Sequence, residues 1–198
     1  MNFFAHLVLA QPTVPSRVGN LLGDFARGID TQSLSPEIYQ GLVNHRRVDH
    51  FTDQHPAVRE LKACFSPQRR RFAGIALDVL FDHYLLLHWE RFSEVPKQSF
   101  IRELYRDLDS GQKLMPERMQ QVTQRISAQD WFSSYEELEG VAYALDRIAS
   151  RIRFQHRFAG VGKELEQNYQ TFEQGFESFF PDLIEEFSSP VIKTPKGF

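Results

Sequence analysis

Apolar residues recur along the chain at the spacing of α-helices, and the helix starts carry recognisable signals. Ser35, Pro36 and Glu37 supply a capping residue, a proline suited to the first turn and an acid near the positive end of the helix dipole. They predict a helix from 36 to about 54, before the next proline. The apolar stretch from 3 to 10 predicts the first helix.

Two more starts extend this pattern. Ser66 and Pro67 precede a long apolar run through Trp89, and the segment from Ser134 to Glu137 has the pattern of a capping box. The sequence has no sustained alternation of apolar and polar residues and no Asn-Gly or Asp-Gly turn, so it predicts no strand and no hairpin. We therefore expect an all-α protein, with a single helical domain over residues 1–187 and a disordered tail over 188–198.

Composition narrows the possible partners. The chain has 198 residues, 41% of them hydrophobic, which suffices for one sizeable core. Its net charge of -3 removes the long-range attraction on which most nucleic-acid binding depends. The single Cys64 cannot form an internal disulfide, and the short apolar opening lacks the basic start of a signal peptide. These features predict a cytoplasmic protein that binds neither nucleic acid nor membrane.

Residues with chemical potential gather in the first half of the chain. Six of the seven histidines lie there, together with a set of aspartates. They are His6, His45, His50, His55, His83 and His88, with Asp24, Asp49, Asp53, Asp78 and Asp82. Any site is expected in this half.

The run from Phe72 to Leu87 is the strongest physical indication of a site. Its ionisable residues, apart from one tyrosine, are Asp78, Asp82 and His83, and apolar residues cover nearly every helical angle around them. A buried carboxylate costs several kcal/mol unless it is paired, hydrogen-bonded or bound to a metal. The two aspartates are four residues apart and share one face. A cation between helices would satisfy all three groups.

A structural interpretation of the same residues stays open. The two acids could bond to helix N-termini or pair with arginines such as Arg46 or Arg47, and His83 could be a satisfied core imidazole. For one such residue this alternative is the stronger. Three in one buried helix favour a functional site, because clusters of perturbed acids and histidines recur at sites.

A second cluster lies on the helix predicted from 36 to 54. His45 and Asp49 are four residues apart, so the carboxylate can orient the imidazole, and Arg46 and Asp53 share a face with Asp49. A solvated, salt-bridged helix surface is the alternative, worth tenths of a kcal/mol per pair. Beside the buried helix, the cluster would form a second wall of one pocket.

The third element is the stretch from Gly19 to Phe25. Gly23 would let a backbone or ligand approach closely, and Asp24 would point into that gap. A helix end with an exposed aspartate is the alternative. His6 alone is more typical of a packed core residue. Oxygen and imidazole ligands without thiolates favour Mn²⁺, Mg²⁺ or Fe²⁺ over structural zinc.

Four blocks of sequence together resemble a known family. They are Met1-Asn2-Phe3-Phe4-Ala5-His6-Leu7, Gly19-Asn20-Leu21-Leu22-Gly23-Asp24-Phe25, His45-Arg46-Arg47-Val48-Asp49 with Phe51-Thr52-Asp53, and Leu77-Asp78-Val79 with Phe81-Asp82-His83. They are similar to the bacterial acyl carrier protein phosphodiesterases, a helical family related to the HD-domain phosphohydrolases. The resemblance implies Mn²⁺-dependent hydrolysis of the phosphodiester between 4′-phosphopantetheine and a serine of holo acyl carrier protein.

The resemblance also implies a ligand set. The chain has no His-Asp dipeptide, the usual metal-binding signature of the HD superfamily, and has Asp49-His50 and Asp82-His83 instead, which implies a rearranged site. We expect Asp24, Asp82 and His83 as metal ligands, with His6 as the fourth.

Further roles follow from residue chemistry. His45 or Asp49 could move the proton that the leaving serine oxygen needs, and Arg46 could stabilise charge on the phosphoryl oxygens. Asp53 and Asp78 complete the expected catalytic set.

Carrier proteins are acidic, so an acidic enzyme needs a local basic patch to dock one. Arg69, Arg70 and Arg71 are the expected patch, and a solvated helix start is the alternative. Two other functions remain open: an HD-like hydrolase acting on a nucleotide or another small phosphodiester, and a helical interaction protein without enzymatic activity.

Overall fold

The described part of the chain is built from helices. The computed structural model describes residues 1–187 and residue 191, and this part contains twelve α-helices and four short 3₁₀ helices but no strand. The α-helices are α1 (Phe3–Val8), α2 (Val14–Leu22), α3 (Pro36–Gln54), α4 (Pro56–Ala63), α5 (Ala73–Leu87), α6 (Trp89–Phe92), α7 (Lys97–Ser110), α8 (Glu117–Ala128), α9 (Trp131–Ser134), α10 (Leu138–Ala149), α11 (Gly162–Gln167) and α12 (Tyr169–Glu186). The 3₁₀ helices are η1 (Gly23–Phe25), η2 (Thr31–Ser33), η3 (Arg70–Phe72) and η4 (Gln112–Leu114). The all-α prediction is confirmed.

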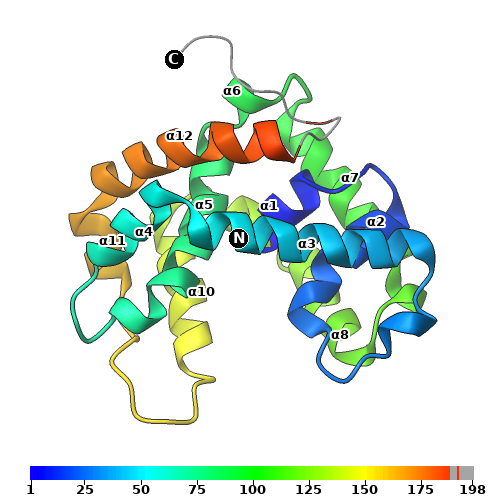
Figure 1. Ribbon diagram of the computed structural model, residues 1–198, viewed down its shortest axis with the longest axis horizontal. Coiled ribbons are helices and arrows are strands. Elements are labelled where there is room, and N and C mark those ends of the chain that lie inside the picture. The colour runs from blue at the N-terminus through cyan, green and yellow to red at the C-terminus, as the bar shows by residue number, and fades with distance from the viewer. Residues whose placement is uncertain (188–190, 192–198) are drawn as a thin grey trace.

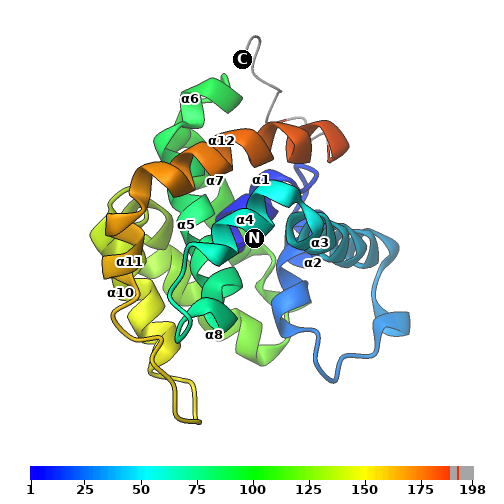
Figure 2. The same ribbon diagram turned by 60° about the vertical axis from the view of Figure 1, so that its left-hand side comes forward.

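Helix α5 lies at the centre of the arrangement. It contacts α1, α4, α10 and α12, and α12 runs across the upper part of the molecule in Figure 1. Most of its side chains are buried, including those of Asp82 and His83. Figure 2 shows the same helices from another side, with α1 held between α5 and α3. The prediction of a covered central helix in this region is confirmed.

One hydrophobic core unites these helices. Its buried residues extend from Met1 to Phe187 and draw on α1, α5, α7, α10 and α12. This supports the prediction of a single domain. The predicted disordered tail, Val191 apart, falls outside the described residues. Among the described helices, none is both long enough and apolar enough to cross a bilayer.

Helices α2 and α3 approach each other unusually closely because glycines face each other between them. A Cβ on Gly19 would lie 2.2 Å from the carbonyl oxygen of Ile38, and one on Gly41 would lie 2.6 Å from that of Ser16. Any side chain here would force the helices apart. This close contact brings the end of α2 and η1 against His45 on α3.

Two predicted helix starts are wrong, and the contacts explain why. The oxygen and backbone N–H of Ser66 bond to Glu164 instead of beginning a helix, and α5 starts only at Ala73. Ser134 ends α9 and donates to the carbonyl of Trp131, so α10 begins later, at Leu138. The predicted helix from 36 to 54 is confirmed, although Ser35 makes no side-chain capping bond.

Candidate functional site

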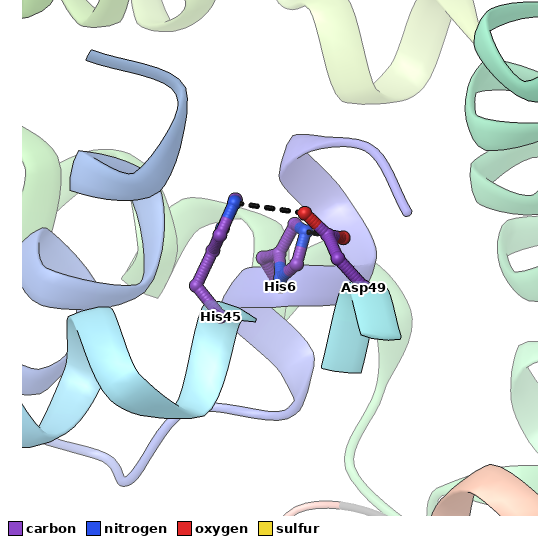
Figure 3. A group of neighbouring side chains, drawn as sticks. All are labelled: His6, His45 and Asp49. Carbon is purple, nitrogen blue, oxygen red and sulfur yellow. Dashed lines mark ion pairs between the residues drawn. The ribbon is translucent and has the colours of Figure 1, made fainter. Parts of the chain in front are cut away.

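Three side chains from two helices converge at one point. His6 comes from α1, whereas His45 and Asp49 lie one turn apart on α3 (Figure 3). One ligand atom from each lies within 4.8 Å of the others. No other group of three His, Cys, Asp or Glu side chains within the described residues meets this condition. We call these three residues the His6–His45–Asp49 cluster.

The position of His6 depends on Asp82. The two carboxylate oxygens of Asp82 accept hydrogen bonds from the backbone N–H groups of Phe4 and Ala5, at 2.9 and 3.0 Å. These are unsatisfied donors of the first turn of α1, and the negative charge also suits the helix dipole. Burial raises the pKa of Asp82 to about 7, although both N–H groups oppose this shift. Asp82 thus anchors the short helix that carries His6.

The orientation of His45 is set by α2 and η1. Its ring lies against Gly23, where a Cβ would come within 2.0 Å of the ring carbon Cδ2. Nδ1 lies 2.7 Å from the carbonyl oxygen of Asn20, which can only accept, so Nδ1 carries a proton. In the neutral ring, Nε2 then keeps its lone pair, 3.1 Å from Oδ2 of Asp49.

The imidazole of His6 is buried without a hydrogen-bond partner. It stacks on the ring of His45 with centroids 3.9 Å apart. Its Nε2 lies 3.1 Å from Oδ1 of Asp49, yet the contact lacks hydrogen-bond geometry, and neither ring nitrogen is satisfied. Burial lowers the pKa of His6 to about 3, so the ring is neutral. Buried polar atoms are rarely left unpaired, and this one points to a ligand.

Asp49 carries the negative charge of the cluster. Burial would raise the pKa of its carboxyl, but the ring nitrogens of His45 and His6, each 3.1 Å from one of its oxygens, and the charge of the Met1 amino group hold that pKa well below its usual range. Burial likewise lowers the pKa of His45, and the hydrogen bond and charge of Asp49, with Asp24, raise it above its usual value. The cluster therefore combines two imidazoles with one carboxylate that stays ionised.

A positive group lies next to the cluster. The buried α-amino group of Met1 is 3.2 Å from Oδ1 of Asp49 and 2.8 Å from Oδ1 of Asp78. Burial works against its charge, but Asp78 and Asp49 raise its pKa to about 10. This ammonium group therefore balances part of the negative charge of Asp49 and Asp78.

Asp24 lies beside the cluster and faces a cavity. It belongs to η1, and solvent reaches its side chain. The surrounding protein raises the pKa of its carboxyl, while the charge of His45 opposes the shift. The cavity, of about 630 Å³, is also lined by Asn2 and Phe3 and by residues of α8, α9 and α10. Asp24 therefore connects the cluster to a space large enough for a small molecule.

His83 and Asp82, two of the ligands predicted from the sequence, are not brought into this group. Nδ1 of His83 donates to the carbonyl oxygen of Tyr135, and Nε2 accepts from the hydroxyl of Tyr169, both at 2.7 Å. Both oxygens of Asp82 are engaged at α1. These contacts match the structural interpretation of both residues, that of a satisfied core imidazole and a helix-end acceptor.

The other predicted residues fall into two sets. His45 and Asp49 meet His6, whereas Asp78 binds the amino group of Met1, and all three lie near Asp24. Arg46 is exposed on α3 and lines a different cavity, of about 720 Å³, whereas Asp53 forms a surface ion pair with Lys62 at 2.6 Å. This pair matches the salt-bridged helix surface given as the alternative.

The predicted docking arginines are partly used within the protein. Arg69 pairs with Glu164 at 2.8 Å and donates to the carbonyl of Ala159. Arg70 donates to the carbonyls of Ala63 and Phe65. The Arg71 guanidinium lies over the rings of Phe72 and Phe154, at 4.5 and 4.6 Å from their centroids.

The sequence did not reveal the role of one supporting residue, Asn20. Asn20 is buried, its carbonyl holds His45, and its side-chain oxygen accepts from Asn44 at 2.9 Å. A polar amide within the apolar end of α2 was the available signal. Its backbone role, however, depends on how α2 packs on α3.

The fold and the cluster define an all-helical protein with a recessed site of two imidazoles and a carboxylate. The family model for acyl carrier protein phosphodiesterase matches residues 1–183. Relatives named acyl carrier protein phosphodiesterase are 38% identical in Yersinia enterocolitica (94% of this chain, 97% of the relative), 37% in Pectobacterium atrosepticum (93% and 96%) and 33% in Escherichia coli (95% and 98%). The chain therefore belongs to the acyl carrier protein phosphodiesterase family. No solved structure matches it.

Proposed function

We propose that this protein hydrolyses the phosphodiester between 4′-phosphopantetheine and a serine of holo acyl carrier protein. The products are apo carrier protein and 4′-phosphopantetheine. Family membership and the names of near full-length relatives support this substrate. The observation that carries the proposal is the His6–His45–Asp49 cluster beside a cavity that Asp24 joins to it.

The cluster is the proposed site of one divalent cation, with Mn²⁺ as the first candidate and Mg²⁺ or Fe²⁺ as alternatives. The donors fit such an ion: His6 has unpartnered ring nitrogens, Nε2 of His45 offers a lone pair when the ring is neutral, and Asp49 stays ionised. The carbonyl of Asn20 supports His45 from behind, as outer partners of histidine ligands usually do. When bound, the ion would supply Lewis acidity toward a phosphoryl oxygen and toward water.

The remaining residues of the site would orient these groups and move protons. Asp82 holds α1, and so keeps His6 in place, through the N–H groups of its first turn. Asp24 lines the cavity and lies near His45 and Asp49, and we assign it the transfer of a proton to the leaving serine oxygen. Asp78 places a second carboxylate near Asp49 and adds to the preference for positive charge.

Two further parts of the proposal concern ancestry and location. A relation to the HD-domain phosphohydrolases is supported by the helical fold and by a donor set of imidazoles and carboxylate. A cytoplasmic location is supported by the lone, exposed Cys64, which has no partner for an intrachain disulfide.

The direct test is mass spectrometry of holo carrier protein incubated with the enzyme and Mn²⁺. We expect conversion to apo carrier protein, and we expect a chelator to stop it. Replacing His45 by alanine should abolish conversion, whereas replacing His50, an exposed histidine on the same helix, should not. An intact prosthetic group in the presence of Mn²⁺, Mg²⁺ and Fe²⁺ would refute the proposed reaction.

A further inference from the structure

The cavity beside the cluster has walls suited to an extended amphipathic chain. Apolar side chains form much of its surface, among them Val79, Val122 and Ile148. Polar side chains interrupt them, including those of Gln129 and Ser134. Ligand sites typically combine apolar walls with a few polar groups that fix orientation. A chain that alternates hydrocarbon and amide segments matches this lining.

Three exposed arginines line the same cavity. Arg118 lies on α8, Arg147 on α10 and Arg151 just beyond the end of α10. Within the described part of the chain, no carboxylate forms an ion pair with any of them. Asp24 and Glu139 line the same cavity, so three arginines against two acids leave its charged lining net positive by one charge, which favours an acidic partner in a protein of net charge -3.

An exposed aromatic residue adds to this surface. Tyr143 is 64% exposed, although it is a large side chain on α10 that also lines the cavity. Nη1 of Arg147 donates to its hydroxyl at 3.2 Å, and the guanidinium lies 5.8 Å from the ring centroid. Tyrosine and arginine are the residues that most often dominate protein interfaces. The pair is therefore well suited to contact a protein at the cavity.

We infer that this cavity receives the phosphopantetheine arm of the holo carrier, while Arg118, Arg147 and Arg151 contact the acidic surface of the carrier. The inference rests on the proposed function and names the binding site for its substrate. Asp24, Asn2 and Phe3 line the end of the cavity next to the cluster, so an arm lying there would place its phosphodiester near His6, His45 and Asp49.

The docking part is tested with two matched double variants. The first variant, Arg147→Ala with Arg151→Ala, removes two arginines of the cavity. The control variant, Arg102→Ala with Arg106→Ala, removes two exposed arginines of α7 that have the same spacing but line no described cavity. Dissociation constants for holo carrier protein are measured in chelator, where no turnover should occur. We expect about tenfold weaker binding and a shallower salt dependence for the cavity variant alone. Equal effects in both variants would overturn the docking role.

The arm part is tested with 4′-phosphopantetheine as the probe. Trp131 lines the cavity, whereas Trp89 is buried elsewhere in the core, so binding should change tryptophan fluorescence in the wild type but not in Trp131→Phe. Ala144→Phe should narrow the cavity and abolish this binding, while its helical circular dichroism spectrum stays that of the wild type. Unaltered 4′-phosphopantetheine binding by Ala144→Phe would overturn the inference.

Failure of the inference differs from failure of the proposed function. If the wild type releases the arm and neither the cavity arginines nor Ala144 matter, the function stands and the inference is wrong. If the wild type binds the arm through these residues but never releases it, the inference stands and the proposed reaction is wrong.

Discussion

Replacing Gly23 by alanine would perturb the cluster through a single added methyl group. The backbone of Gly23 has φ -52° and ψ -41°, which any residue adopts, so the substitution causes no backbone strain. The new Cβ would lie 2.0 Å from Cδ2 and 2.2 Å from Nε2 of His45, whereas ordinary contacts begin at 3.4 Å. The ring must therefore move by at least about 1.4 Å.

That displacement should be costly for catalysis and mild for folding. A misplacement of about 1 Å in a catalytic constellation can lower the rate by about 100-fold, and a shift of one side-chain ring leaves the helices intact. We expect Gly23→Ala to lower kcat/KM for holo carrier protein, and Mn²⁺ affinity, by about 100-fold. The melting temperature should fall by about 2–12 °C, since overpacking costs about 1–3 kcal/mol and each kcal/mol lowers it by about 2–4 °C in a chain of this size.

The matched control for this variant is Gly74→Ala. Gly74 is also helical, but its added Cβ would meet only the end of the Lys62 side chain, at 3.8 Å. Activity should stay at the wild-type level, and stability should be equal or higher because alanine restricts the unfolded chain. If Gly23→Ala kept wild-type activity and Mn²⁺ affinity, the assigned position of His45 at the site would be wrong.

Three further outcomes are expected. Asp82→Ala should destabilise the metal-free protein by about 2 kcal/mol or more, measured by urea denaturation, because two N–H groups of α1 lose their acceptors; unchanged stability would exclude the anchoring role. The pKa of His6 is about 3 in the folded state and 6.5 in the unfolded state, so the free energy of unfolding should fall as pH drops from 6.5 toward 3, by up to about 1.4 kcal/mol per pH unit. His6→Phe, measured in chelator, should show a shallower fall. An identical slope would contradict a neutral buried imidazole. Replacing Arg69, Arg70 and Arg71 by alanine should lower the melting temperature, because these arginines bind groups within the protein. Hydrolysis of holo carrier protein and of the small phosphodiester bis(p-nitrophenyl) phosphate should slow to the same extent. A loss of activity confined to the carrier would support the docking role predicted from the sequence.

Helical periodicity predicted the fold class well because each helix buries an apolar stripe that the sequence displays directly. The start of α3 and its end at Gln54 follow from a local proline at each side. The start of α10 differs from the prediction because Ser134 ends α9 and donates to the nearby carbonyl of Trp131. The start of α5 could not be predicted, because Ser66 bonds to Glu164, which lies 98 residues away in the sequence. A local capping signal cannot reveal such a distant competitor.

The sequence indicated which residues form the candidate site better than it indicated how they are arranged. Asp24 and Asp78 stood out as acids within apolar stretches, His45 and Asp49 by their spacing of four residues, and His6 only in company with the others, and the structure gathers them.

The sequence could not assign partners to two residues of the buried helix. Whether Asp82 and His83 turn to an ion, a helix end or a carbonyl depends on α1 and on the segments that carry Tyr135 and Tyr169, all distant along the chain. Because both side chains are buried, each needs a polar partner. Which partner it has depends on how the helices pack.

The most direct test of the central claim is a crystal structure grown with Mn²⁺ and analysed by anomalous scattering. We expect one manganese peak bounded by Nε2 of His6, Nε2 of His45 and a carboxylate oxygen of Asp49, with Asp82 still bonded to the N–H groups of Phe4 and Ala5. A peak between Asp82 and His83, or no peak at the three-residue cluster, would contradict the account.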